Sequence, residues 1–229
     1  MAQTYKNWEW IVVDDCSTDS SEEILKKIAE FDQRVKVYKN QVNSGASVAR
    51  NKGLDQSSGE IIAFLDIDDE WLPSKLEQQI DFMKKENVMV SCHSYMMMRE
   101  NGDVFKQISV PNEVTSSHLE ALCPLATSFM MLDKKVIGDL RFNTSLRRRQ
   151  DWIFWYEILK QGYVCKGLDI ILGKYRKDSV NSISKNKFKM ALIQWKLYRN
   201  YFGFNLIKSI VCFFKYSTYG ISKHYLSRK

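Results

Sequence analysis

The chain has 229 residues, and 45% of them are hydrophobic, which is enough to build one main domain with a sizeable core. It carries 34 Lys and Arg against 27 Asp and Glu, and the formal charge of +7 favours anionic partners such as nucleotides, phospholipid headgroups or nucleic acid. Its five cysteines are scattered without CxxC spacing, which argues against a complete disulfide framework or a zinc site and indicates reduced cytosolic thiols.

Neither end of the sequence carries a membrane-crossing signal. The first residues, "MAQTYKNWEW", lack the basic and apolar segments of a secretory leader. The longest apolar stretch near the end, "NLIKSIVCFFKYSTYG", is interrupted by Lys208 and Lys215 and is shorter than the roughly 20 helical residues that cross a bilayer. We therefore expect a cytoplasmic protein without a spanning helix.

The first half of the chain is expected to alternate between strands and helices. Apolar, β-branched runs mark the strands, and capping residues followed by apolar positions at helical spacing mark the helices. The expected elements are a strand over Trp8–Val13, a helix in "STDSSEEILKKIAEF", a strand in "RVKVYK", a helix over Ala46–Leu54 and a strand in "EIIAFLD". This order predicts a parallel sheet with right-handed crossovers, whose ligands bind beyond the carboxyl ends of the strands.

The second half mixes helices and strands in a less regular order. The expected elements are a helix after Pro73, a strand pair in "NVMVSCHSYMMM" and "DVFKQISV", a short helix near 115–122, a strand near 128–132, a helix in "RRRQDWIFWYEILKQGY" and a strand in "LDIILGKY". We expect an α/β domain over residues 1–185, with a mostly parallel central sheet flanked by helices. A basic, aromatic and helical extension is expected over residues 186–229.

The segment "FLDIDDEW" follows an expected strand with three aspartates, Asp66, Asp68 and Asp69, within four positions. Carboxylates left unpaired at a strand end repel one another, and a bound cation or exposure to water removes that cost. Alternate residues of an extended segment point the same way, so Asp66 and Asp68 can share one ligand, and hard oxygen donors select Mg²⁺ or Mn²⁺. The alternative is a solvated turn with helix-capping aspartates.

A second acidic pair, Asp14 and Asp15 in "VVDDCSTD", follows the first expected strand, so a parallel sheet would bring it to the same rim as Asp66. A carboxylate there can accept a hydrogen bond from a ribose hydroxyl or a base imino group. The sequence contains neither GxGxxG nor GxxxxGK[ST], so neither a dinucleotide fingerprint nor a P-loop is supported. The alternative role for this segment is helix capping by Asp19 or Ser20.

Asp151 in "RRRQDWIFW" lies just inside an expected helix start, where the helix dipole stabilises a carboxylate, and this structural role alone would explain it. The functional alternative is a general base flanked by Trp152 and Trp155, whose ring faces can stack on a sugar. Residues 147–149, all arginine, either contact phosphates or form a solvated basic loop. The sequence contains no recognisable Ser-His-Asp or Cys-His arrangement, which disfavours a hydrolase.

Together these segments resemble the family 2 nucleotide-sugar glycosyltransferases, which have the GT-A fold. The matching pieces, in order, are "QTYKNWEWIVVDDCSTDSS", "NSGASVARNKGLDQSSGEIIAFLDIDDEWLP", and "QDWIFWYEILKQGY" followed by "YRKDSVNSIS". Motifs in this order and spacing are far more specific than an isolated DxD. The resemblance implies a GT-A fold and transfer of a sugar from a nucleoside diphosphate sugar.

The resemblance also implies roles in binding the nucleotide sugar. Asp15 would recognise the nucleotide base, with Asp14 beside it. Asp66 would contact the ribose and diphosphate, and Arg50 and Trp152 would complete the donor site.

Metal binding and catalysis are implied in the same way. Asp68 and Asp66 would hold Mn²⁺ or Mg²⁺, and Asp151 matches the family's catalytic base. The segment "YRKDS" stands where many members have a histidine near the metal, and Asp178 lies at or beside that position as a further ligand. Gln150 replaces a glutamate that commonly precedes the base.

The front of the chain departs from the family pattern. Members usually begin with a further strand and helix before the "QTY" segment, and here the sequence starts at that segment. We therefore expect a sheet without one of its central strands. A chain that truly starts at Met1 would be a fragment or an impaired enzyme, and a misassigned start is the alternative.

The expected function is inverting, metal-dependent transfer of a sugar, most simply from a UDP-sugar, to a hydroxyl of a glycan or lipid-linked glycan in polysaccharide or lipopolysaccharide assembly. The alternatives are an impaired homologue that serves as a scaffold, and a nucleotidyltransferase. No nucleic-acid partner is expected, and oligomerisation is left open.

The tail after residue 186 mixes aromatic residues and cations as interfacial helices do, which predicts peripheral attachment to the inner face of a bacterial cell membrane. Packing on the catalytic domain or on a second subunit is the alternative.

Overall fold

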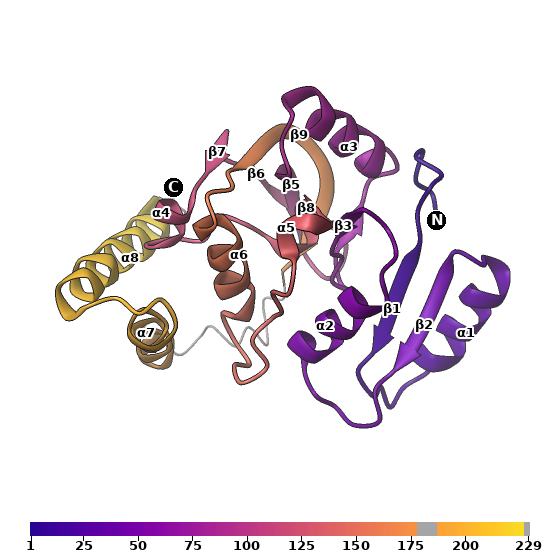
Figure 1. The fold of residues 1–229 in the computed structure, drawn as a ribbon, viewed down its shortest axis with the longest axis horizontal. Helices are drawn as coiled ribbons and strands as arrows, with labels where there is room; N and C mark the ends of the chain where they lie inside the picture. Colours follow the sequence, from indigo (N-terminus) through magenta and orange to yellow (C-terminus); the bar gives the residue numbers. More distant parts are fainter. Residues whose placement is uncertain (178–186, 227–229) are drawn as a thin grey trace.

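The computed structural model of the protein describes residues 1–177 and 187–226. Two β-sheets with helices around them form an α/β fold, and the predicted fold class is confirmed. The strands β1 and β2 lie at one end of the molecule and the helices α7 and α8 at the other (Figure 1). Asp178, one of the predicted metal ligands, falls outside the described residues.

The first sheet is a parallel pair. It consists of β1 (Trp10–Asp14) and β2 (Val35–Lys39), which are connected through α1 (Ser21–Phe31), and α2 (Ala46–Gln56) follows β2. This strand-helix-strand-helix order is the predicted one. Ser57 then ends α2 in an extended conformation and leads the chain into the second sheet.

The second sheet has seven strands within the described residues. Five follow one another in the order β3 (Ile61–Ala63), β8 (Met130–Asp133), β5 (Val90–Met98), β9 (Cys165–Arg176) and β4 (Glu70–Trp71), while β6 (Val104–Ile108) pairs with β5 and β7 (Glu113–Val114) pairs with β9. Only β5 and β9 run parallel, and the other pairings in this sheet are antiparallel. The expectation of a mostly parallel sheet is therefore wrong, because the second half of the chain supplies hairpin and returning strands, which pair antiparallel.

The strands β1 and β3, expected in one parallel sheet, belong to different sheets of the described chain. β3 pairs antiparallel with β8, with Ile61 opposite Asp133. The segments before the two strands are still joined, because the Glu9 carboxylate accepts hydrogen bonds from the backbone N–H of Ser58 (2.5 Å) and Gly59 (2.9 Å). Hydrophobic periodicity marks a strand but does not identify its neighbour.

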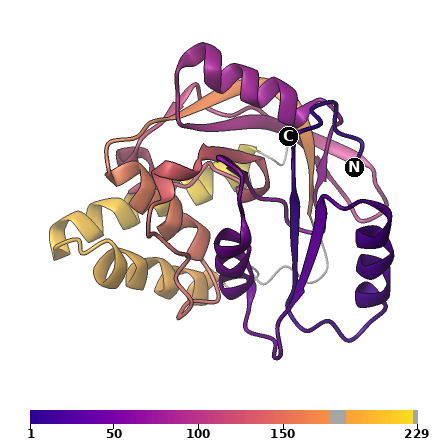
Figure 2. The same cartoon turned by 45° about the vertical axis from the view of Figure 1, so that its right-hand side comes forward.

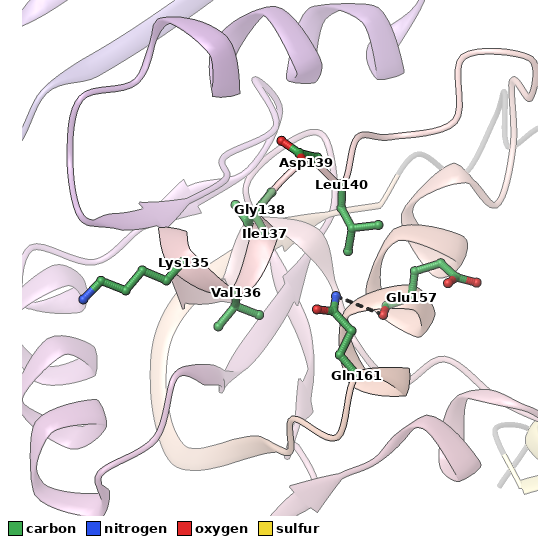
Figure 3. Close-up of a pocket in the computed structure, with 8 residues that line it drawn as sticks. All are labelled: Lys135, Val136, Ile137, Gly138, Asp139, Leu140, Glu157 and Gln161. Atoms are coloured by element: carbon green, nitrogen blue, oxygen red, sulfur yellow. Dashed lines mark hydrogen bonds between the residues drawn. The ribbon is translucent and has the colours of Figure 1, made fainter.

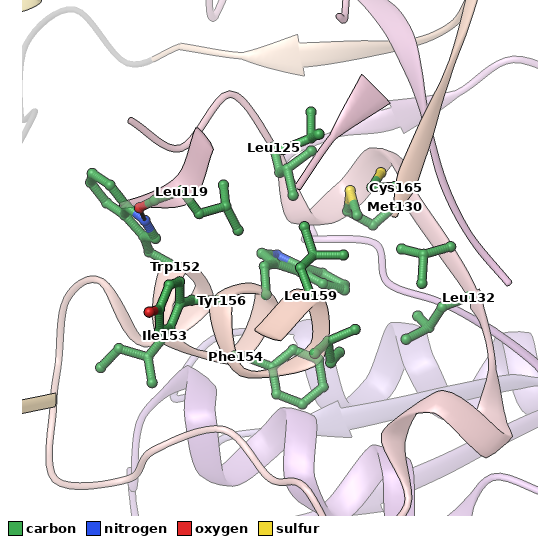
Figure 4. Close-up of a cluster of buried hydrophobic side chains, with 14 of the residues drawn as sticks. Leu119, Leu125, Met130, Leu132, Trp152, Ile153, Phe154, Tyr156, Leu159 and Cys165 are labelled. Carbon is green, nitrogen blue, oxygen red and sulfur yellow. Dashed lines mark hydrogen bonds between the residues drawn. The ribbon is translucent and has the colours of Figure 1, made fainter. Parts of the chain in front are cut away.

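Helices cover both faces of the second sheet. Successive side chains of a strand point to opposite faces, so Met131 of β8 packs against α3 (Lys75–Glu86), whereas Met130 and Leu132 belong to the cluster around α6 (Gln150–Lys160). Figure 2 shows α3 above the sheet, and Figure 4 shows the side chains of α6 that fill the larger cluster. Both helices were predicted from their apolar periodicity.

The middle of the chain contains three short helical turns. They are α4 (Ser116–Leu119), the 3-10 turn η1 (Thr127–Phe129) directly before β8, and α5 (Lys134–Ile137) directly after it. The predicted short helix and strand in this region are confirmed to within a few residues.

The C-terminal segment is helical, as predicted. It contains α7 (Lys187–Lys196), the π-helical turn η3 (Leu197–Tyr201) and α8 (Leu206–Leu226). It is packed on the rest of the protein, since the ring of Phe202 stacks on Tyr156 of α6 at a centroid distance of 3.9 Å. Among the helices of the described residues, none has the length and apolar content that crossing a bilayer requires. The domain boundary at residue 185 stays a prediction.

Candidate active site

The acidic loop between β3 and β4 is held in place by Ser128, which precedes β8. The Ser128 hydroxyl accepts a hydrogen bond from the backbone N–H of Asp66 (3.1 Å) and donates one to Oδ2 of Asp69 (2.5 Å). The Ser128 carbonyl accepts from the indole N–H of Trp71 (2.6 Å). Ser128 is only 1% exposed, so these contacts are made away from solvent. One buried serine thus connects two positions of the loop and the strand β4 that follows it.

Asp69 anchors the loop, and its carboxylate is already occupied. Its Oδ1 accepts from the backbone N–H of Arg176 (2.9 Å) at the end of β9, and its Oδ2 accepts from Ser128. Burial raises the pKa of Asp69 to about 6, and these hydrogen bonds offset part of that effect. The Arg176 side chain adds a second tie, since its Nε donates to the carbonyl of Asp68 (3.0 Å).

Asp66 meets Arg50, one of the predicted donor-binding residues. Nη2 of Arg50, on α2, lies 2.5 Å from Oδ1 of Asp66. The Asp66 side chain is 42% exposed and the Arg50 side chain 15% exposed, so the pair sits at the surface with the cation on the inner side. Within residues 1–177 and 187–226, no hydrogen-bond donor reaches the carboxylate of the exposed Asp68, which leaves it open to a ligand.

Tyr175 lies near the end of β9 and is 36% exposed. Partial burial raises the pKa of its hydroxyl, and the negative charges of Asp69, Asp68, Asp66 and Asp151 raise it further. The acidic loop and Asp151 of α6 therefore act on the pKa of the same hydroxyl. Sequence reasoning missed Tyr175, although its place near the carboxyl end of the predicted strand "LDIILGKY" put it at the expected ligand-binding edge.

The second predicted acidic pair lies at the end of β1, and Asp15 there holds the loop before α2. Its Oδ1 accepts from the side-chain amide of Asn40 (2.8 Å) and the N–H of Ser44 (3.0 Å), and its Oδ2 accepts from the N–H of Gly45 (2.6 Å). Burial by itself raises the pKa of Asp15, but these hydrogen bonds outweigh it and lower the pKa below its usual value. Asp15 therefore fixes the start of α2 in this structure.

Asp14 has one occupied and one open carboxylate oxygen. Its Oδ1 accepts from the N–H of Ser17 (2.9 Å), while its Oδ2 is buried without a partner among the described residues. Helix α2 connects this acidic pair to the acidic loop, because its start is held by Asp15 and its Arg50 pairs with Asp66.

The two tryptophans beside Asp151 are core residues. Trp152 and Trp155 are 2% and 0% exposed, and their indole N–H groups donate to the Leu119 carbonyl (2.6 Å) and to Oγ1 of Thr127 (3.3 Å). The expectation that their rings stack on a sugar is corrected here, since both ring faces are covered by protein. In the sequence, a row of aromatic residues on one face of a helix has the same spacing whether the face packs in a core or binds a ligand, so the sequence does not distinguish the two.

The arginines before Asp151 tie the tail to the site. Nη2 of Arg149 donates to the hydroxyl of Tyr216 on α8 (2.9 Å), and its guanidinium lies 4.9 Å from the ring of Trp152. Arg149 adopts a left-handed backbone conformation (φ 64°) directly before α6. A pocket of about 250 Å³ next to it is lined by residues of the tail, including Lys196 and Tyr201.

A metal ion would find two candidate ligands, Asp66 and Asp68, in the described part of the chain. No group of three or more His, Cys, Asp or Glu side chains there is arranged to hold one. Two carboxylates nevertheless fit Mg²⁺ or Mn²⁺, since such ions are commonly bound by one or two carboxylates and completed by substrate phosphates and water. A surface pocket of about 370 Å³ lies between α5 and α6 instead (Figure 3). It contains none of the predicted site residues, as its lining residues Lys135, Val136, Ile137, Gly138, Asp139, Leu140, Glu157 and Gln161 show.

The sequence of this chain is similar to those of known glycosyltransferases. The family model described as "Glycosyl transferase family 2" matches residues 1–151. TuaG of Bacillus subtilis, named as a teichuronic acid biosynthesis glycosyltransferase, is 36% identical over 222 residues, which cover 96% of this chain and 87% of TuaG. WfgD of Escherichia coli, named as a UDP-Glc:alpha-D-GlcNAc-diphosphoundecaprenol beta-1,3-glucosyltransferase, is 35% identical, with 98% of this chain and 86% of WfgD covered.

Solved structures share the fold at lower identity. TarS of S. aureus, residues 1-349 in complex with UDP-GlcNAc, superposes with a TM-score of 0.66 at 22% identity, over 94% of this chain and 64% of the TarS chain. The mannosyltransferase PcManGT of Pyrobaculum calidifontis, in complex with GDP-Man and Mn2+, gives a TM-score of 0.60 at 15% identity, over 87% of this chain and 58% of that one. These similarities concern the fold.

Proposed function

The chain belongs to glycosyl transferase family 2 and is a nucleotide-sugar glycosyltransferase, and from this premise we propose that it transfers a sugar with inversion from a UDP-sugar to an acceptor hydroxyl, with a divalent metal at the donor site. The observation that carries the proposal is the acidic loop after β3, in which Asp69 is held in place while Asp68 stays exposed and Asp66 pairs with Arg50. Asp66 and Asp68 would supply the metal-binding pair from this loop, and Asp151 of α6 would supply the base.

The donor and acceptor classes are proposed from the relatives. WfgD and WfaP of Escherichia coli carry names that specify UDP-Glc as donor and a GlcNAc-diphosphoundecaprenol acceptor. The structural neighbour TarS binds UDP-GlcNAc. We propose that this chain uses a UDP-sugar and a glycan or lipid-linked glycan acceptor, in polysaccharide or lipopolysaccharide assembly at the inner face of a bacterial cell membrane.

Asp151 is the proposed catalytic base. As the acceptor oxygen attacks the anomeric carbon, its proton passes to the Asp151 carboxylate, the bond from the anomeric carbon to the diphosphate oxygen breaks, and the nucleoside diphosphate leaves. A single displacement of this kind inverts the anomeric centre. A retaining route through an enzyme-bound sugar would need a carboxylate nucleophile at the same carbon.

Asp66 and Asp68 are the proposed metal ligands, with Asp178 as a third. When bound, Mn²⁺ or Mg²⁺ supplies positive charge that stabilises the departing diphosphate. Arg50 supports the same charge balance, because its pairing with Asp66 orients that carboxylate and brings a cation to the donor site. The open Oδ2 of Asp14 is the proposed acceptor of a hydrogen bond from the nucleoside, beside Asp15.

Replacement of Asp151 by Asn tests the assignment. The variant D151N should lose transfer by about a thousandfold or more, since an amide cannot take the proton, while UDP binding in the presence of Mn²⁺ stays within about twofold of the unchanged protein. The exposed Asp139, in the pocket of Figure 3 that contains none of the predicted site residues, provides the matched control D139N, which should keep full activity. Loss of UDP binding in D151N would contradict the role of base. Absence of any metal-linked UDP binding in the unchanged protein would favour a scaffold.

A further inference from the structure

The outer face of α8 carries a row of exposed apolar side chains. Ile207, Ile210, Val211 and Phe214 are 75%, 53%, 47% and 69% exposed. Their spacing of three and four residues puts them on one side of the helix, and we call these four residues the outer stripe. Contiguous exposed apolar side chains of this kind mark an interaction site.

The opposite face of α8 is already packed, so the outer stripe is not a misplaced core face. Ser209 and Cys212 are 0% and 5% exposed. The Tyr216 hydroxyl accepts from Arg149, and Nζ of Lys208 lies 2.6 Å from Oε1 of Glu120. α8 lies at the outer edge of the molecule, at the end opposite to α1 (Figure 1). The helix is therefore fixed to the catalytic part with its apolar stripe facing outward.

The charge of the C-terminal segment indicates the kind of surface that the stripe meets. From residue 179 to residue 229 the sequence contains ten Lys and Arg and no Asp or Glu. Lys215 follows Phe214 on the exposed part of α8. A helix with an apolar stripe, flanking cations and no anions matches the interface of a bilayer that contains anionic lipids, where apolar side chains enter the acyl boundary and cations meet the headgroups.

We infer that α8 lies in the plane of an anionic membrane surface, with Ile207, Ile210, Val211 and Phe214 inserted among the lipids. The inference rests on the proposed function in one respect: a lipid-linked acceptor would be met at that surface. Arg149 connects α8 to the start of α6, so docking of α8 would hold Asp151 at a fixed height above the lipid headgroups.

Cosedimentation with vesicles tests the inference. The full chain should bind vesicles of mixed phosphatidylglycerol and phosphatidylcholine and should bind pure phosphatidylcholine vesicles at least about tenfold more weakly. The double variant I207E/F214E should lose about tenfold or more of the binding to the anionic vesicles, because two carboxylates replace the inserted side chains. Both positions are exposed, so circular dichroism and thermal unfolding should match those of the unchanged protein.

The helix α1 provides a control with the same chemistry. Ile24 and Phe31 are 53% and 84% exposed there, and I24E/F31E introduces the same two charges far from α8. This control should bind within about twofold of the unchanged protein, apart from a small long-range charge effect. Equal losses in the two double variants would overturn the inference. So would a dimer in solution that only I207E/F214E dissociates, since the stripe would then be an interface between two copies.

The vesicles contain neither glycan nor nucleotide sugar, which separates this test from that of the proposed function. D151N should bind anionic vesicles as the unchanged protein does. Normal vesicle binding together with absent transfer would leave the docking surface intact and refute the proposed activity. Normal transfer to a soluble acceptor without vesicle binding would support the proposed activity and refute the docking surface.

Discussion

The Ser128 hydroxyl donates a hydrogen bond of 2.5 Å to Oδ2 of Asp69 and accepts one of 3.1 Å from the backbone of Asp66. This serine comes from the segment before β8, more than fifty residues along the chain from the loop that it holds. The neighbouring carboxylates of this loop therefore differ in their roles. Asp69 is buried and fixes the loop, whereas Asp66 and Asp68, the proposed metal ligands, are more exposed.

Replacing Ser128 with Ala should disturb the donor site without removing any residue that touches the donor. The buried Asp69 would lose one of its two partners, which should lower the free energy of unfolding by about 1–3 kcal/mol. The loop would be less well positioned, so the KM for the UDP-sugar should rise about tenfold. Steady-state kinetics and denaturant unfolding measure the two effects.

Ser91 provides the matched control for this substitution. It is also buried, at 0% exposed, and its hydroxyl accepts a hydrogen bond from Gln79 of α3 (3.0 Å) rather than from a residue of the acidic loop. The variant S91A should lose a comparable amount of stability with an unchanged KM. If S91A and S128A raised the KM equally, the effect would be a general loss of stability, and the positioning role of Ser128 would be rejected.

Asp68 is the predicted ligand whose removal should act on the metal alone. Its carboxylate is exposed and has no partner among the described residues, so D68A should leave the stability within about 0.5 kcal/mol of the unchanged protein. UDP affinity in Mn²⁺ should fall by about tenfold or more, while UDP affinity in EDTA should not change. Calorimetric titration gives both values. The exposed Asp81 on α3 is the control, and D81A should retain the full difference between Mn²⁺ and EDTA.

The ion pair of Arg50 and Asp66 should be visible as coupling between substitutions. Because the two side chains lie 2.5 Å apart, R50M and D66N should not lower kcat/KM independently. A double-mutant cycle should give a coupling energy of about 1 kcal/mol, within the range of partly exposed pairs. Strict additivity would show that the pair does not act as a unit in the enzyme, and the proposed orientation of Asp66 by Arg50 would be withdrawn.

The order of the elements was readable from the sequence, but the direction of strand pairing was not. The segments that became β1, α1, β2 and α2 were predicted in place because each has its own period and caps. The pairing of β3 with β8 depends on side chains that are distant in the chain. Local patterns contain no information on such a partner. The alternation of strands and helices in the first half of the chain therefore predicted a parallel sheet, whereas most strands from the second half pair antiparallel.

The candidate site was predictable where its residues form a local motif. Asp66 and Asp68 are separated by one residue, and that spacing predicted that their carboxylates can share one ligand. Ser128 and Tyr175 were missed, since a single serine or tyrosine in a strand has no local signature and acquires its role only by long-range packing. The prediction for Trp152 was wrong in the opposite sense. This aromatic residue of a helix was predicted to bind the donor, but its side chain is buried in the core.

His93 should make the stability of the protein depend on pH. It is 0% exposed, its Nε2 has no partner among the described residues, and its ring packs near Phe129 at 5.1 Å. Burial and, to a lesser extent, the nearby Lys75 lower the pKa of His93, a hydrogen bond with the Ser94 carbonyl opposes them, and the net result is a pKa of about 3 instead of 6.5. The folded protein therefore keeps His93 neutral at pH 5, where an unfolded chain binds a proton.

The sign follows from this difference in bound protons. Between the folded pKa near 3 and the unfolded pKa near 6.5, the unfolded state binds more protons, so stability falls as the pH is lowered through that range. From pH 7 to pH 5 the contribution of His93 should be a loss of about 2 kcal/mol. In H93Q the slope over the same range should be smaller than in the unchanged protein by about one proton. Urea unfolding at several pH values measures these slopes, and an unchanged slope in H93Q would show that His93 is protonated in the folded protein.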